Sequence, residues 1–225
     1  FMPEPACSNT PLHLALLYAA PECRGFRESR DTASFLVDAM PFDALVLANA
    51  SGQTAMALAA SAGALKIAKA LAKRAVPVRF PEFCLALEHG RLSVAEWVFE
   101  ILQTDSSDEG APDADRARQL AIPIIVQAAA RNDFPSSLVA ELLDGFIALG
   151  SSVCEPFRAD GATPLHLAVQ EQAVDPVAIA LLKRGADAQA QDAAGRTPLA
   201  MMRPGPLRDM FRFFAASEQG RPPPS

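Results

Sequence analysis

One hexapeptide occurs twice in this chain and limits what it can fold into more than any other feature. The string Thr-Pro-Leu-His-Leu-Ala occupies residues 10–15 and again residues 163–168. Degraded copies follow at 52–59, which reads Gly-Gln-Thr-Ala-Met-Ala-Leu-Ala, and at 195–200, which reads Gly-Arg-Thr-Pro-Leu-Ala. The threonines of the copies at 163–168 and 195–200 are 34 residues apart. A period of this length indicates repeated supersecondary units that stack on one another.

Each position of the hexapeptide has a mechanical reason. Threonine is expected at a helix N-cap, where its hydroxyl accepts a hydrogen bond from an unpaired backbone N–H. Proline at the first helical position loses nothing by lacking an N–H, and the leucines begin a buried face. A second helix is expected to end in the string Leu-Leu-Lys-Arg-Gly-Ala-Asp at 181–187, with basic residues in its last turn and glycine after it.

These motifs make the chain resemble the ankyrin-repeat family. The resemblance implies an all-α solenoid of stacked helix-turn-helix units joined by β-turn loops. Two weaker copies, 83–102 and 125–144, keep the helix pattern without the hexapeptide, and Pro81 and Pro123 occupy the place of the threonine. We therefore expect one domain over residues 1–217 with repeats near 5–48, 49–76, 77–103, 118–157, 158–191 and 192–217.

Three segments depart from the regular period. The first repeat is too long, since Thr10 and Thr54 are 44 residues apart, and we place the excess around 21–26. Residues 104–117 are acidic and poor in apolar side chains, which predicts a mobile surface loop. Residues 218–225 are proline-rich and are expected to be disordered.

The acidic loop allows two readings besides a solvated linker. Residues 105–110 are spaced like the start of a calcium-binding EF-hand loop, but Arg116 stands where the twelfth-position glutamate is needed. Ser106 and Ser107 precede acidic residues and would suit an acidophilic kinase, whose phosphate would change the charge of the loop. We favour the linker.

Near the C-terminus, a proline-rich turn at 204–206 is expected to shorten the first helix of the last repeat. Leu207, Met210, Phe211 and Phe214 then follow at helical spacing and predict one apolar helix face. Phe213 lies off this face, and we expect it to pack on the preceding helix.

Composition and motifs argue against several classes of function. A net charge of −6 with scattered basic residues disfavours nucleic-acid binding. The four cysteines form no CxxC pair or metal-ligand spacing, so we expect no metal and reduced thiols in the cytoplasm or nucleus. The uncharged stretch 44–65 contains turn residues, so we expect no membrane insertion. No catalytic motif or cofactor site is present, and we expect no enzyme activity.

The histidines have structural explanations. His13 and His166 belong to the hexapeptide, and the resemblance implies that their imidazoles hydrogen-bond between the loops of neighbouring repeats. His89 is expected at the surface near the end of a first helix. Cys84 stands where the motif histidine would be and is expected to be a buried, inert thiol.

The resemblance places partner binding on the concave side, which is built from turn tips and the inner faces of the first helices. The candidate residues are Tyr18, Gln53, Phe80, Glu88, His89, Arg131, Gln170, Glu171 and Arg196. We favour Tyr18, Phe80, His89 and Arg131, because aromatic residues and arginine dominate interface energetics. For Phe80, packing beneath the turn is an equal alternative, and Trp97 is expected to pack between helices.

The sequence thus favours a protein–protein interaction module, a scaffold or targeting domain whose partner is another protein. The alternative is a regulatory segment of a larger enzyme or channel whose active part lies outside this chain. A small-ligand or catalytic function has little support in the motifs.

Overall fold

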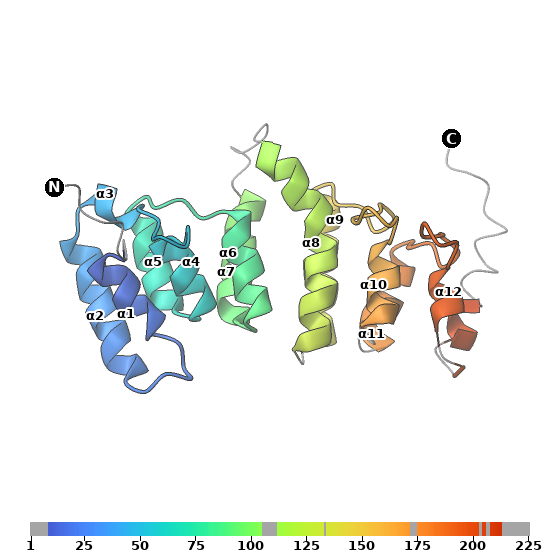
Figure 1. The fold of residues 1–225 in the computed structure, drawn as a ribbon, viewed down its shortest axis with the longest axis horizontal. Coiled ribbons are helices and arrows are strands. Elements are labelled where there is room, and N and C mark those ends of the chain that lie inside the picture. The colour runs from blue at the N-terminus through green and yellow to red at the C-terminus, as the bar shows by residue number, and fades with distance from the viewer. Residues whose placement is uncertain are drawn as a thin grey trace. The chain divides into compact units, whose positions relative to one another are not determined.

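The computed structural model describes residues 9–104, 112–132, 134–171, 175–202, 204–205 and 208–212, with the side chains of 112–118 and 175 left aside. The chain divides into two compact units, residues 1–107 and residues 108–225, and each is described by itself. Within the described ranges the regular secondary structure is helical, apart from one isolated bridge between Ala48 and Thr54 (Figure 1). This confirms the all-α prediction.

The first unit is a stack of three helix pairs. Its first helices, α1, α4 and α6, pack on one another in that order, and each also packs against the second helix that follows it. The second helices also pack in order, α2 on α5 and α5 on α7. The helices are α1 (Pro11–Leu17), α2 (Phe26–Ala39), α3 (Phe42–Leu45), α4 (Ala55–Ser61), α5 (Leu65–Lys73), α6 (Phe80–Glu88) and α7 (Leu92–Thr104).

The threonine caps form as the motif predicts. The backbone N–H of His13 donates to Thr10 Oγ1 at 3.3 Å, and that of Ala57 donates to Thr54 Oγ1 at 3.2 Å. In the first repeat the motif histidine completes the cap, because Thr10 N–H donates back to His13 Nδ1 at 3.1 Å. The backbone N–H groups of both Thr10 and His13 therefore have hydrogen-bond acceptors.

The first helix of the third repeat begins two residues earlier than expected. The N-cap of α6 is Arg79, so Pro81 is the second residue inside the helix and does not cap it, although the C-cap His89 keeps the register of the other repeats. The side chain that accepts from the N-cap N–H is therefore that of Glu82 and not that of Cys84, with Glu82 Oε2 accepting from Arg79 N–H at 3.0 Å. Hydrophobic periodicity could not show this, because a carboxylate and an imidazole can accept the same backbone hydrogen bond.

The excess length of the first repeat is only partly where we expected it. A loop over residues 18–25 does separate α1 from α2. However, α2 also has 14 residues, against nine in α5, and the short helix α3 follows it. The insertion is thus shared between a loop, a longer helix and an added helical turn.

The core of the first unit runs between neighbouring repeats. Leu12 and Leu16 of α1, Met56 of α4 and Leu71 of α5 are almost completely buried in one cluster. Trp97 of α7 packs against this cluster from the third repeat, as expected for a residue between helices. Because each helix pair buries its apolar side on the next, no pair has a core of its own.

The second unit contains α8 (Pro112–Arg131), α9 (Ser136–Ala148), α10 (Pro164–Gln170), α11 (Asp175–Lys183) and α12 (Pro198–Met201). α8 packs on α9 and α10, α11 packs on α9 and α10, and α12 packs on α10. The helix α12 ends at Met201, in line with the predicted short first helix of the last repeat. Residues 208–212 are helical and Phe211 is fully buried, whereas Leu207, Phe213, Phe214 and the tail lie outside the described residues.

The start of the fourth repeat differs from the prediction. Pro123 lies inside α8, eleven residues after its first residue, and not at a cap. Consequently residues 112–117, which we assigned to the acidic loop, are helical. Proline removes one helical hydrogen bond, and the burial of neighbouring side chains such as Ile122 and Ile125 compensates for it. The serines and acidic residues at 105–111 lie outside the described residues.

Repeats are joined at their turns by hydrogen bonds. His166 Nδ1 accepts from Thr163 N–H at 3.2 Å, so its Nε2–H donates to the carbonyl of Arg196 at 3.0 Å in the next repeat. This confirms the expected role of His166. The equivalent atom of His13 is buried without a hydrogen-bond partner, so the expectation is wrong for that residue. Burial lowers the pKa of His13, and the backbone at Gln53 and Leu47 opposes this shift without reaching hydrogen-bond geometry at Nε2.

A pocket at the ends of the first helices

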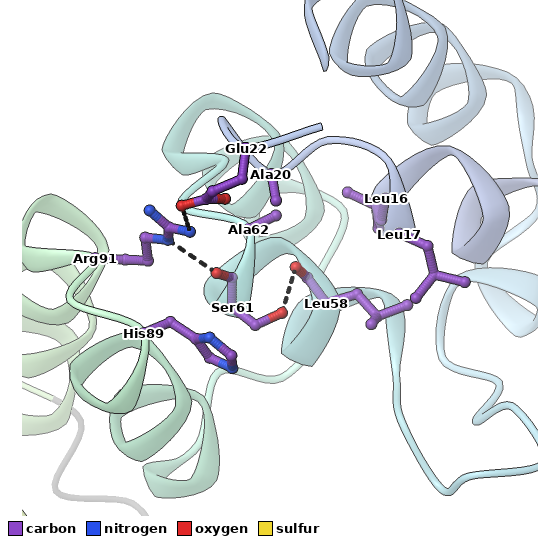
Figure 2. A pocket seen from close by; sticks show the side chains of 9 residues that line it. All are labelled: Leu16, Leu17, Ala20, Glu22, Leu58, Ser61, Ala62, His89 and Arg91. Carbon is purple, nitrogen blue, oxygen red and sulfur yellow. Dashed lines mark hydrogen bonds and ion pairs between the residues drawn. The ribbon is translucent and has the colours of Figure 1, made fainter. Parts of the chain in front are cut away.

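The first unit has a pocket of about 320 Å³ where α1, α4 and α6 end (Figure 2). It is open on one side, and residues from three consecutive repeats form it. The lining residues are Leu16, Leu17, Ala20, Glu22, Leu58, Ser61, Ala62, His89 and Arg91.

Repeat geometry explains why these residues meet. Leu17 and Ser61 are the last residues of α1 and α4, and His89 is the C-cap of α6. Because the first helices stack side by side, equivalent positions at their ends come together although they are far apart in the chain. Leu58 and Ala62 supply a buried apolar wall.

Arg91 closes one side of the pocket, and its side chain is held in place. Its Nε–H donates to the carbonyl of Ser61 at 3.1 Å, and its Nη2 donates to Glu22 Oε1 at 2.6 Å (Figure 2). The Arg91 stem lies directly over Gly63, where an added Cβ would approach Cδ to 2.9 Å. Glu22 comes from the inserted loop of the first repeat, and the hydrogen bond from Arg91 holds the pKa of its carboxyl below the usual range.

An exposed apolar strip on α1 adjoins the pocket. Leu14, Leu17 and Tyr18 are 48%, 42% and 60% exposed, and their i, i+3, i+4 spacing places them on one helix face. The residue at the Leu14 position is Leu58 in α4, which is only 4% exposed. Leu17 belongs to both the strip and the pocket, so the apolar strip continues into a pocket of mixed polar and apolar lining.

The candidate residues of the first unit fall into two groups. His89 lines the pocket, and Tyr18 and Glu88 are exposed beside its lining residues Leu17 and His89. Gln53 lies apart, in the half-buried turn before α4, where its N–H donates to Asn49 Oδ1 at 2.9 Å. Phe80 is the first residue of α6 and packs against Phe83 with ring centroids 5.9 Å apart. It is therefore a half-buried packing residue and not a turn tip.

The candidates of the second unit occupy corresponding helix ends. Arg131 is the last residue of α8, Gln170 is the last residue of α10, and Glu171 is the α10 C-cap; all three are exposed. α8 and α10 pack against each other. Arg196 lies in the turn before α12, where its guanidinium pairs with Asp192 at 2.8 Å.

Arg91 and Glu22 are the charged pocket residues that the sequence did not suggest. A signal was present, because Arg91 directly follows the glycine that ends a first helix and Glu22 lies in the one inserted loop of the repeat. Neither position belongs to the motif, and only the folded stack shows that the loop reaches the third repeat.

Three further features of the described residues bear on the classes of function considered above. They contain no group of three or more histidine, cysteine or acidic side chains arranged to hold a metal ion. Burial raises the pKa of the Cys84 thiol to about 12, so this cysteine is a poor nucleophile at neutral pH. In the part of the chain that the structure describes, no helix is both long and apolar enough to cross a membrane.

Comparison with known proteins agrees with this architecture. Residues 160–193 match the ankyrin-repeat family model. A segment of 90 residues is 39% identical to the potassium channel AKT3 of Oryza sativa subsp. japonica; it covers 38% of this chain and 10% of the channel. The chain thus spans only a small part of that relative's length.

Among solved structures, the ankyrin repeat domain of Bcl-3, described as a unique member of the IkappaB protein family, has a similar fold. The TM-score is 0.54 with 16% sequence identity, and the match covers 91% of this chain and 99% of that domain. At this identity the likeness concerns the fold alone. The chain thus contains a segment that matches the ankyrin-repeat model and has the fold of an ankyrin repeat domain.

Proposed function

We propose that this chain is a protein-interaction module that binds a partner protein at the surface formed by the pocket, the α1 strip of Leu14, Leu17 and Tyr18, and the exposed end of α6. The observation that carries the proposal is the continuity of these features. Apolar side chains of this size are normally covered, and an exposed apolar surface beside polar groups is typical of interaction sites.

The composition of the surface also fits binding of a protein. Tyr18 offers a large amphipathic ring, and His89 and Arg91 offer directional hydrogen-bond donors at the other side of the pocket. An extended segment crossing from α1 to α6 would contact three repeats at once. Arg131, Gln170 and Glu171 extend the proposal to the helix ends of the second unit.

The test begins with a partner recovered by affinity purification from the native cells and then prepared in pure form. Its affinity for the full chain is measured by calorimetry with Tyr18→Ala and His89→Ala variants. Each substitution is expected to weaken binding by about 1–2 kcal/mol, the usual effect of removing a favourable interface side chain. Lys69→Ala and Glu96→Ala, exposed on α5 and α7, serve as matched controls.

The variants must retain the thermal unfolding of the wild-type chain, because only then does a lost affinity report on contact. If Tyr18→Ala and His89→Ala bind normally while the α5 and α7 controls lose affinity, the binding surface lies on the second helices. The proposal for this surface would then be wrong.

A second arrangement is compatible with the first. The identity to a segment of a potassium channel favours a regulatory ankyrin segment within a larger enzyme or channel. In that case the partner protein would be another part of the same polypeptide or assembly, and the same two variants would weaken its binding.

A further inference from the structure

The guanidinium of Arg91 is more firmly placed than the carboxylate it binds. Its side chain is only 20% exposed, and the hydrogen bond to the Ser61 carbonyl fixes its orientation from within the stack. The side chain of Glu22 is 66% exposed and belongs to the loop between α1 and α2. A fixed cation therefore meets an exposed anion at the edge of the pocket.

The Glu22–Arg91 pair does not use the full capacity of the guanidinium. The hydrogen bond joins one carboxylate oxygen to one terminal nitrogen, whereas arginine and carboxylate groups can form two parallel hydrogen bonds. Exposed ion pairs contribute little net stability, so replacing Glu22 by another carboxylate costs the chain little. Glu22 thus occupies the place that an incoming acidic group would take.

We propose that the pocket recognises a partner segment carrying an acidic side chain close to an apolar one, with the partner carboxylate displacing Glu22 from Arg91. The apolar side chain would lie against Leu17, Leu58 and Ala62. This inference rests on the proposed function and names the chemistry of the segment that the surface binds.

The other polar groups of the pocket favour the same occupant. His89 lies on the pocket wall formed by the third repeat, two residues before Arg91 in the chain, and its imidazole can donate a hydrogen bond to a carboxylate (Figure 2). Ser61 uses its hydroxyl within α4, donating to the Leu58 carbonyl at 3.0 Å, and it supplies only a backbone acceptor to Arg91. Once Glu22 is displaced, Arg91 is the charged side chain left among the lining residues, which disfavours a basic partner.

Synthetic peptide pools test the proposal without knowledge of the natural partner. The pools are degenerate nonapeptides with acetylated and amidated ends, a fixed leucine, and glutamate, glutamine or lysine fixed two residues away. The full chain is immobilised and the retained peptide is quantified. Wild-type chain is expected to retain the glutamate pool about threefold better than the glutamine pool, as a partly exposed ion pair allows.

Removing the internal competitor should strengthen the preference. Glu22→Gln is expected to raise retention of the glutamate pool further, because Arg91 then lacks its carboxylate partner, whereas Glu96→Gln on α7 should change nothing. Arg91→Gln should abolish the preference between glutamate and glutamine. Because Arg91 also supports the stack, the thermal unfolding of the Arg91→Gln variant is measured. If that variant does not fold, the comparison of wild type with Glu22→Gln, a change at an exposed residue, still tests the proposal.

Equal retention of the glutamate and glutamine pools by both wild type and Glu22→Gln would overturn the inference, and so would preferential retention of the lysine pool. Retention of no pool by either protein would also overturn it. The proposed function is judged separately, by the effect of Tyr18→Ala and His89→Ala on the intact partner.

Discussion

At the scale of single residues, the N-terminal caps show how one mechanical task is met by different chemistry. In α1 and α10 the third helical residue is a histidine whose Nδ1 accepts from the cap N–H, and in α6 Glu82 does the same. Imidazole can do this in its neutral form. Glu82 is only 7% exposed, and burial raises the pKa of its carboxyl above the usual range.

Replacement of Glu82 by glutamine should therefore remove a pH-dependent loss of folding stability. The folded state binds the Glu82 proton more tightly than the unfolded state, so its contribution to stability falls as the pH rises through the folded pKa. Each unit of upward shift corresponds to about 1.4 kcal/mol above that pKa. Glu82→Gln keeps an oxygen that can accept from Arg79 N–H.

The measurement is chemical denaturation of wild type and Glu82→Gln at pH 4 and pH 7.5. The unfolding free energy of Glu82→Gln, relative to that of wild type, should be higher at pH 7.5 than at pH 4. Loss of a charge near the α6 N-terminus costs about a few tenths of a kcal/mol, which does not reverse this trend. An unchanged difference across this range would show that Glu82 does not carry the shifted pKa.

At the scale of elements, the ends of the second helices are the least uniform part of the repeats. After α9 and α11 the chain turns through Gly150 and Gly185 with φ values of 94° and 85°. After α5 the same left-handed turn is made by Ala75 with φ of 61°. The left-handed region crowds Cβ against the following carbonyl, so an alanine there is strained.

Ala75→Gly should consequently stabilise the chain. Ala75 is exposed, so little packing is lost with its methyl group, and relief of strain is expected to raise the unfolding free energy by about 1 kcal/mol. Urea denaturation of the full chain measures the change. Ala72→Gly, inside α5, is the control and should destabilise by a similar amount through lost helix propensity. A destabilised Ala75→Gly variant would contradict the assigned backbone conformation.

The same helix ends carry an arginine with a role that the helix dipole alone does not explain. Arg74 Nη1 donates to the carbonyl of Val37 at 2.7 Å, and Arg184 Nη2 donates to the carbonyl of Ala140 at 3.0 Å. Each of these arginines thus ties its second helix to the second helix of the preceding repeat. Arg184, one of the basic residues that the sequence placed in the last turn of a second helix, is thus also a link between repeats.

At the scale of the whole molecule, the second helices differ in which sides they bury. In α7, α9 and α11 most buried residues come in adjacent pairs, such as Val94 with Ala95 and Leu181 with Leu182. In α2, Ala33 and Val37 are buried but Ser34 and Asp38, which follow them, are exposed. A polar outer flank of this kind keeps the end of a helix stack from associating with other molecules.

An apolar outer flank on α2 should cause association. The double variant Ser34→Leu, Asp38→Leu is expected to remain folded and to sediment as a concentration-dependent oligomer, since it adds apolar area beside the exposed Phe35. Lys69→Leu with Glu96→Leu, on α5 and α7, adds the same side chains away from this flank and is expected to associate less. A strictly monomeric double variant would show that this flank of α2 is not open.

The sequence alone was sufficient to determine the repeat architecture, because caps, turn glycines and helix periodicity act within a few residues. Thr10, Thr54 and Thr197 cap helices where the motif places them, and His166 makes its predicted link. Where the motif is degenerate, local signals misplaced the cap of α6 and the start of α8.

The pocket, in contrast, depended on tertiary structure. His89 was predicted near the end of a first helix, but its meeting with Leu17, Ser61, Glu22 and Arg91 follows from the stacking of three repeats. The ion pair joins residues 69 positions apart in the chain. A contact of that range depends on the path of an inserted loop and on the orientation of packed helices, and periodicity within one repeat records neither.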